Sequence, residues 1–218
     1  MSAYVYYTNE NYEILLENNQ HAYVLNKKMN SVHFLPYKPS LHALGLEGPY
    51  KVNIDILDVA SYIMVLISII CSLSILISVF NYPLTFFSNI SLNTVLLKLV
   101  FVVVNVVTHE LAHFATMRMF GRSSGGFSYK GEGMYIGFSV DTTEAYLLPR
   151  YRRFIVFYSG ALTNILLTWL WITAFPGHRF SSVLVLLAII ACLIPSARPK
   201  TDGYNILKHV FKQNTYEV

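Results

Sequence analysis

Charged residues are scarce in this 218-residue chain. Asp, Glu, Lys and Arg make up 13% of it, whereas they make up about a quarter of an average soluble domain. Hydrophobic residues reach 54%, and the mean hydropathy is +0.45. This composition excludes an ordinary soluble domain or binding module and predicts an integral membrane protein.

Cysteine is also scarce, and the usual export signal is missing. The two cysteines, Cys71 and Cys192, both lie in apolar runs, which excludes a disulfide framework and a CxxC metal clip. Residues 1–57 are polar and lack a basic stretch followed by an apolar one, so we expect no cleavable signal peptide. We therefore expect the first apolar run to anchor the chain.

Long apolar runs, by contrast, occur four times. An α-helix needs about 20 mainly apolar residues to cross a bilayer. The runs at 59–80, 94–117 and 154–175 have that length, and a shorter fourth run covers 182–196. The fourth is either another span or a buried hairpin or re-entrant segment. We expect the fold class to be an all-α integral membrane protein with about four transmembrane helices.

The domain organisation that we predict follows from these runs. An N-terminal cytosolic segment covers 1–57, and a transmembrane core covers 58–198 and includes a β-like loop at 121–149. Residues 199–218 form a cytosolic tail. Each boundary is placed where the hydropathy changes.

Two parts of the chain predict β-structure. Residues 125–140 are rich in Gly and aromatic residues and predict a short β-hairpin. Its edge either pairs with an extended substrate or merely covers the helices. In the N-terminal segment, alternation at 21–25 and 32–35 predicts small strands.

Lysine and arginine alternate between the loops. The connection 81–93 contains neither, and 176–181 contains only Arg179. The remaining loop cations lie before the first run, between the second and third runs, or in the tail. Because positive loops stay in the cytoplasm, both termini are predicted to be cytoplasmic. Topology thus explains the net charge of +4, and no nucleic-acid partner is expected.

An HExxH pattern, His109-Glu110-Leu111-Ala112-His113, lies near the end of the second apolar run. Residues four apart share one face of a helix, so His109 and His113 can bind one Zn²⁺ while Glu110 serves as general base. A chance match is the alternative. Two imidazoles and a carboxylate inside a membrane span are costly unless a cation satisfies them, which favours a metal site.

The depth of this site follows from helix geometry. His109 lies 15 residues after the start of its run at 94, or about 22 Å into a core about 30 Å thick. The metal is therefore expected within the membrane, nearer the cytoplasmic side. Hydrolysis at that depth requires a cavity that water can enter from the cytoplasm.

A catalytic zinc site has three protein ligands, so a third must lie downstream. Asp202 is the preferred acidic residue, because Pro195 and Pro199 precede it and break the fourth run. Capping of the following helix is its alternative role. The other acidic residues considered are Glu132, Asp141, Glu144 and Glu217.

Over about residues 97–208, the sequence resembles the site-2 protease type of intramembrane zinc metalloproteases. It is most similar to the bacterial branch associated with ribosomally made peptides and bacteriocins. Four elements in order carry the resemblance: HELAH at 109–113, VDTTEAYLLPRYRR at 140–153, SGALTN at 159–164 and DGY at 202–204.

The resemblance implies a three-helix core that holds one Zn²⁺ per chain through His109, His113 and Asp202. Zinc-activated water would hydrolyse a peptide bond in a membrane-associated peptide or protein, with Glu110 as general base and acid. Asn164 either supports the substrate carbonyl or oxyanion, or makes a hydrogen bond between helices. The resemblance also implies the bacterial cytoplasmic membrane and a role in maturation of a ribosomally made peptide.

Two departures from the family pattern keep an alternative open. Ala161 stands where proline is usual. The family pattern before the ligand is Asn-x-x-Pro-x-x-x-x-Asp-Gly, whereas here Cys192 takes the place of the Asn, and Pro195 lies two residues further from Asp202 than usual. These departures favour a non-proteolytic zinc-binding accessory or immunity protein, whereas the intact Glu110 favours a protease. A prenyl-peptide protease with a glutamate ligand in a later span is disfavoured, since no later span contains one.

Overall fold

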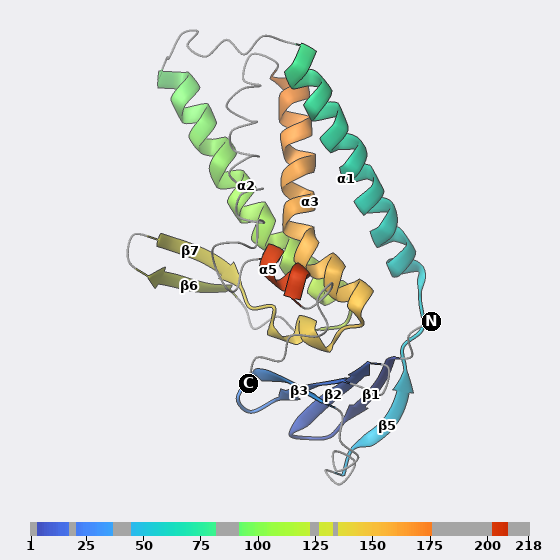
Figure 1. Cartoon of the computed structure of the whole chain (residues 1–218). Helices are drawn as coiled ribbons and strands as arrows, with labels where there is room; N and C mark the ends of the chain where they lie inside the picture. Colours follow the sequence, from blue (N-terminus) through green and yellow to red (C-terminus); the bar gives the residue numbers. More distant parts are fainter. Residues whose placement is uncertain are drawn as a thin grey trace.

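A computed structural model describes residues 4–17, 21–36, 45–81, 92–122, 127–132, 135–175 and 202–208. The fourth apolar run, with Cys192, Pro195 and Pro199, lies outside the described residues. The described residues form two regions: an N-terminal sheet of strands β1 to β5 and a helical core of α1, α2 and α3 (Figure 1).

The N-terminal sheet is antiparallel, with the strand order β4-β3-β2-β1-β5. Leu15, Tyr23 and Leu25 project from one face, and Ile14 and Val24 from the other, because neighbouring side chains alternate. The strands are β1 (Tyr4–Thr8), β2 (Tyr12–Glu17), β3 (His21–Asn26), β4 (Ser31–Pro36) and β5 (Glu47–Lys51).

The predicted all-α fold class is therefore confirmed only in part, because the chain combines the expected helices with a five-stranded sheet. The small strands predicted at 21–25 and 32–35 are present in β3 and β4. The prediction did not include β1, β2 and β5, which complete a five-stranded sheet. A sheet needs at least three strands to bury a hydrophobic face. The two predicted strands alone would therefore not have formed a stable sheet.

The helical core consists of three long helices: α1 (Ile56–Asn81), α2 (Leu92–Met119) and α3 (Arg150–Ala174). Within the described residues, these three are long and apolar enough to cross a membrane, which indicates a membrane protein. The predicted fourth helix falls outside those residues. α3 lies between α1 and α2 (Figure 1), and 56% of its candidate span is buried, compared with 22% for α1 and 11% for α2.

A reciprocal cap starts α1. The Asp55 carboxylate accepts hydrogen bonds from the backbone N–H groups of Leu57 and Asp58, and the Asp58 carboxylate accepts one from the Asp55 N–H. Arg152, in the first turn of α3, donates to both carboxylates at 2.7–3.0 Å. The start of α1 is thus tied to the start of α3.

A hairpin and a short 3-10 helix connect α2 to α3. Strands β6 (Phe127–Glu132) and β7 (Tyr135–Val140) pair antiparallel, as the sequence predicted. The 3-10 helix η2 (Thr143–Leu147) follows, and α5 (Asp202–Ile206) packs on α3. The Tyr146 hydroxyl donates to the Asn205 side chain at 3.0 Å, which joins η2 to α5.

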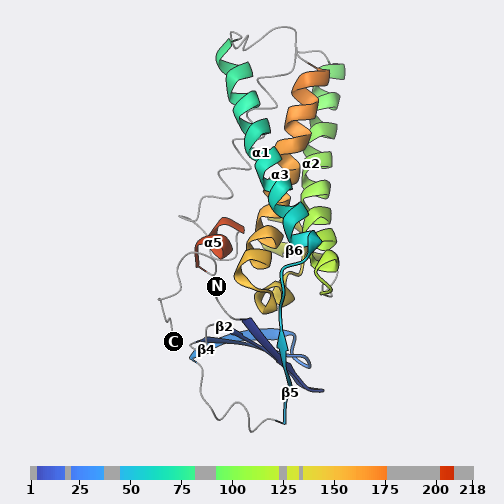
Figure 2. The same cartoon turned by 90° about the vertical axis from the view of Figure 1, so that its right-hand side faces the viewer.

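The N-terminal sheet lies against the end of the helical core that carries η2 (Figures 1 and 2). Leu147 packs among Leu15, Tyr23 and Leu25. The fully buried Arg153 guanidinium lies 4.0 Å from the centre of the Tyr23 ring and donates to the Tyr23 hydroxyl at 2.6 Å. Arg153 therefore joins the two regions, in addition to the topological role expected for the arginines before α3.

A polar cavity of about 590 Å³ lies at this junction. Arg122, just beyond α2, borders it and donates to the Glu13 carboxylate at 2.6 Å. Lys27 forms a second ion pair with Glu13 at 3.3 Å. The other lining residues are Leu25, Asn30, Arg118, Gly121 and Glu144.

Candidate metal centre

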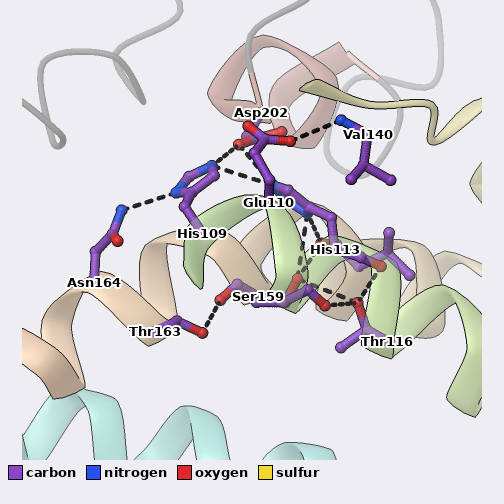
Figure 3. Close-up of polar contacts among 11 residues, drawn as sticks. His109, Glu110, His113, Thr116, Val140, Ser159, Thr163, Asn164 and Asp202 are labelled. Carbon is purple, nitrogen blue, oxygen red and sulfur yellow. Dashed lines mark hydrogen bonds and ion pairs between the residues drawn. The ribbon is translucent and has the colours of Figure 1, made fainter. Parts of the chain in front are cut away.

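His109 and His113 lie four residues apart on α2, and Asp202 approaches them from α5 (Figure 3). The Nε2 atoms of the two histidines are 3.2 Å apart. The Asp202 Oδ2 atom is 3.1 Å from His109 Nε2 and 3.2 Å from His113 Nε2. Three possible ligand atoms therefore converge on one point, as the sequence analysis expected of these residues.

These separations fit zinc. A tetrahedral site with bonds of about 2.0–2.1 Å to nitrogen and oxygen separates its ligand atoms by about 3.3 Å. Two imidazole nitrogens and one carboxylate oxygen are also a donor set typical of catalytic zinc sites. Among the described residues, His109, His113 and Asp202 form the one such group of metal-ligating side chains.

The three side chains differ in their access to solvent. The His113 side chain is 4% exposed, whereas those of His109 and Asp202 are 18% and 23% exposed. The exposed parts of His109 and Asp202 leave one side of the site open to solvent.

Glu110 follows His109 on α2 and contacts the end of the hairpin. The backbone N–H of Val140, the last residue of β7, donates to the Glu110 carboxylate at 2.8 Å (Figure 3). Val140 is buried and Glu110 is half-buried. The hairpin therefore orients the side chain that the sequence analysis assigned as general base.

α3 contacts both imidazoles from the other side. The Val156 carbonyl accepts a hydrogen bond from His113 Nδ1 at 2.7 Å. The Asn164 amide nitrogen lies 2.8 Å from His109 Nδ1. Between them, Gly160 lies so close to His109 that an added Cβ would overlap the imidazole ring. No role for Val156, Gly160 or Val140 was predicted from the sequence, although Gly160 lies in the SGALTN element and Val140 begins the element at 140–153.

The other acidic residues do not join the cluster in the described residues. Asp141 accepts hydrogen bonds from Thr143 and from Asn30. Glu144 lines the junction cavity. Nothing is described of the Glu132 side chain, and Glu217 lies outside the described residues.

The comparisons with known proteins agree with this chemistry at a general level. The chain is 25% identical over 213 residues to a Bacillus subtilis (strain 168) protein named "Putative peptide zinc metalloprotease protein YydH". The alignment covers 92% of this chain and 81% of that protein. This similarity supports a relationship to zinc metalloproteases. No protein-family model matches the chain, and no solved structure matches it.

Proposed function

We propose that this protein is an intramembrane zinc metalloprotease of the site-2 protease type. The observation that carries the proposal is the convergence of His109, His113 and Asp202 within 3.2 Å, although Asp202 is 93 and 89 positions away from the two histidines. The first two lie on a helix long enough to cross a membrane. The similarity to a protein named as a zinc metalloprotease supports the same conclusion.

The residues of the site divide the chemistry between them. His109, His113 and Asp202 would hold zinc, which supplies a Lewis acid that acidifies water and polarises the peptide carbonyl. Glu110 accepts the proton of the attacking water and returns it to the leaving amine. The Val140 N–H keeps the Glu110 carboxylate in a fixed orientation during both transfers.

The location within the membrane is part of the proposal. His109 lies 14 residues after the start of the candidate span Val95–Met119, or about 21 Å along the helix. The end of α3 and α5 lie at different levels of the helical core (Figure 1). With the run at 182–196 as a fourth span, both termini lie on the same side of the membrane, and the Lys and Arg residues of the loops favour the cytoplasmic side.

The substrate class is a membrane-embedded or membrane-associated peptide or protein. The similar Bacillus protein carries the word "peptide" in its name, which supports a peptide substrate. Maturation of a ribosomally made peptide is the role that the family resemblance implies. The His109 and Asp202 side chains are partly exposed. A substrate and water can therefore reach the ligands from that side.

The first test measures zinc in the detergent-purified protein by mass spectrometry. We expect about one zinc per chain in the wild type and in His33→Ala, a control histidine in β4, and loss of zinc in His113→Ala and Asp202→Ala. Absence of zinc from a folded wild type would contradict the metal centre. Zinc retained in Asp202→Ala would contradict Asp202 as the third ligand and make Asp141 the next candidate.

The second test separates a protease from a zinc-binding accessory protein. Small peptides encoded near this protein's gene are expressed with the wild type or with Glu110→Gln, and their masses are compared. Glu110→Gln should lower cleavage by about 10²–10⁴-fold while zinc stays bound. Equal cleavage by both proteins would contradict the assigned general base, and no cleavage by a zinc-loaded wild type would favour the accessory role.

A further inference from the structure

Three positions on one face of α3 contact the two imidazoles. Val156, Gly160 and Asn164 are spaced four residues apart, so they lie one above another on the helix surface. Val156 binds His113 through its carbonyl, and Gly160 and Asn164 contact His109. This stripe therefore acts on the orientation of both candidate ligands.

The hydrogen bond from His113 determines which of its nitrogens can bind a metal. Its Nδ1–H donates to the Val156 carbonyl at 2.7 Å, which leaves Nε2 without a proton. Nε2 is the atom that faces His109 and Asp202. An imidazole that binds a metal through one nitrogen normally donates the N–H of the other to a fixed acceptor.

His109 needs the same arrangement, and Asn164 is the residue at its Nδ1. Asn164 is 2% exposed, and its Oδ1 atom is buried without a partner among the described residues. The amide nitrogen, a donor, lies 2.8 Å from His109 Nδ1. In this arrangement Nδ1 accepts a hydrogen bond, and the imidazole proton is on Nε2, which donates to Asp202.

A metal bound at Nε2 would require that proton to be on Nδ1. Nδ1 would then need an acceptor, and a half-turn of the Asn164 amide would bring Oδ1 to this position. The turn would pair the buried oxygen and place the amide nitrogen where the oxygen had been. One side chain can thus serve both states of His109, because an amide offers a donor and an acceptor.

Gly160 limits where the ring can lie. The atom that an added Cβ would reach first is His109 Nε2, the candidate ligand atom itself. A glycine at this position lets the imidazole pack directly on the α3 backbone. A larger residue would displace the ligand atom.

We propose that Asn164 is a positioning residue: it holds His109 in the tautomer and orientation that present Nε2 to the metal. This inference rests on the proposed zinc site. It differs from a role in binding the substrate carbonyl or oxyanion, because the Asn164 amide contacts the ligand and acts through it.

The test compares Zn²⁺ affinity, measured by competition with a chromophoric chelator, in the purified full-length protein. Asn164→Leu removes the acceptor and should weaken Zn²⁺ binding about 10–100-fold. Asn164→Asp keeps an acceptor and should bind within about threefold of the wild type. The control is Thr168→Val, which removes another buried polar atom without a described partner, one turn further along α3, and should change nothing.

The Co²⁺ form provides a second readout that does not depend on activity. Its visible absorption spectrum reports ligand geometry and should change in Asn164→Leu and in Gly160→Ala, but not in Thr168→Val. Wild-type affinity and an unchanged spectrum in Asn164→Leu would overturn the positioning role and leave the zinc site intact. Failure of the folded wild type to bind Zn²⁺ would overturn the site and this inference with it.

Discussion

The N-terminal sheet and the helical core differ in where they put polar groups. The sheet buries apolar side chains such as Leu15 and Tyr23, as a water-soluble fold does. The helical core exposes Ile, Leu and Val on α1 and α2 and buries Asn105, Asn164 and Thr168. One chain thus combines a region with an apolar interior and a region with an apolar exterior.

This difference explains where the candidate metal centre lies. Polar groups inside a membrane are costly unless they are paired or face a functional cavity. In the helical core, the buried polar residues Ser159 and Asn164 contact the imidazoles of His113 and His109. The site therefore occupies the polar interior of the region whose surface suits lipid.

The largest effect is expected from a charge placed on the exposed surface of each region. Ile70→Asp, at a 58% exposed position in α1, should destabilise the membrane-inserted protein by about 3 kcal/mol. Met29→Asp, at a 72% exposed position between β3 and β4, should change stability by less than about 0.5 kcal/mol. The folded fraction recovered from membranes, measured by size-exclusion chromatography, checks both.

Equal effects of these two variants would contradict the comparison, because the α1 surface would then face water. Leu73→Asp is at another exposed position on α1 and should destabilise the protein as Ile70→Asp does. Agreement between the two variants shows that the effect does not depend on the local surroundings of Ile70.

An intermediate effect is expected at the junction of the two regions. Burial raises the pKa of Glu13, but hydrogen bonds with Tyr6 and Arg122 outweigh burial and hold that pKa below its ordinary value of 4.5. The ionised carboxylate therefore stabilises the folded state above that value, and this stabilisation is lost as the pH falls through the lowered pKa. Thermal unfolding should show Glu13→Gln to be less stable than the wild type by about 1–2 kcal/mol at pH 7.

The difference between Glu13→Gln and the wild type should disappear in strong acid. The matched control is Glu10→Gln, since Glu10 is exposed and its variant should follow the wild type at each pH. A pH-independent gap between Glu13→Gln and the wild type would show that the charge of Glu13 does not join the regions.

The smallest effect is expected where the sheet contacts the residue after β7. Asn30 donates to Asp141 at 2.7 Å, and Asp141 follows Val140, which orients Glu110. Asn30 has φ of +45°, so Asn30→Gly removes the hydrogen bond without backbone strain and should cost about 0.5–1.5 kcal/mol.

Amide hydrogen exchange of Val140 measures whether this contact reaches the site. Asn30→Gly should make that amide exchange faster than in the wild type, while the Ile14 amide in the sheet interior keeps its rate. Unchanged exchange at Val140 would show that the sheet and the Glu110 carboxylate are independent.

Local patterns in the sequence were sufficient for much of the fold. Apolar length predicted three of the spans, because each helix must cover the bilayer with its own side chains. Alternation predicted the β6–β7 hairpin and part of the sheet. The strands β1, β2 and β5 were missed since YVYYT, YEILLE and EGPYK do not alternate apolar and polar residues, and pairing with their neighbours stabilises them.

The candidate site likewise has parts that local sequence predicts and parts that depend on tertiary contacts. Helix periodicity alone placed His109 and His113 on one face and Glu110 beside them. Asp202 was preferred over Asp141 and Glu144 because Pro195 and Pro199 break the run before it, and the family resemblance favoured the same residue. The structure brings Asp202 to the two imidazoles. The contacts of Val156, Gly160 and Val140 with the side chains of the HExxH pattern could not be predicted. No local pattern specifies which backbone groups of another element these side chains meet.

The apolar helices, the hairpin and the placement of two histidines beside a glutamate follow from local sequence, because they depend on backbone periods of two and 3.6 residues. Three contacts depend on the fold instead: Asp202 with the histidines, Arg153 with Tyr23, and Asn164 with His109. These contacts join residues 55 to 130 positions apart, so the packing of whole elements selects them.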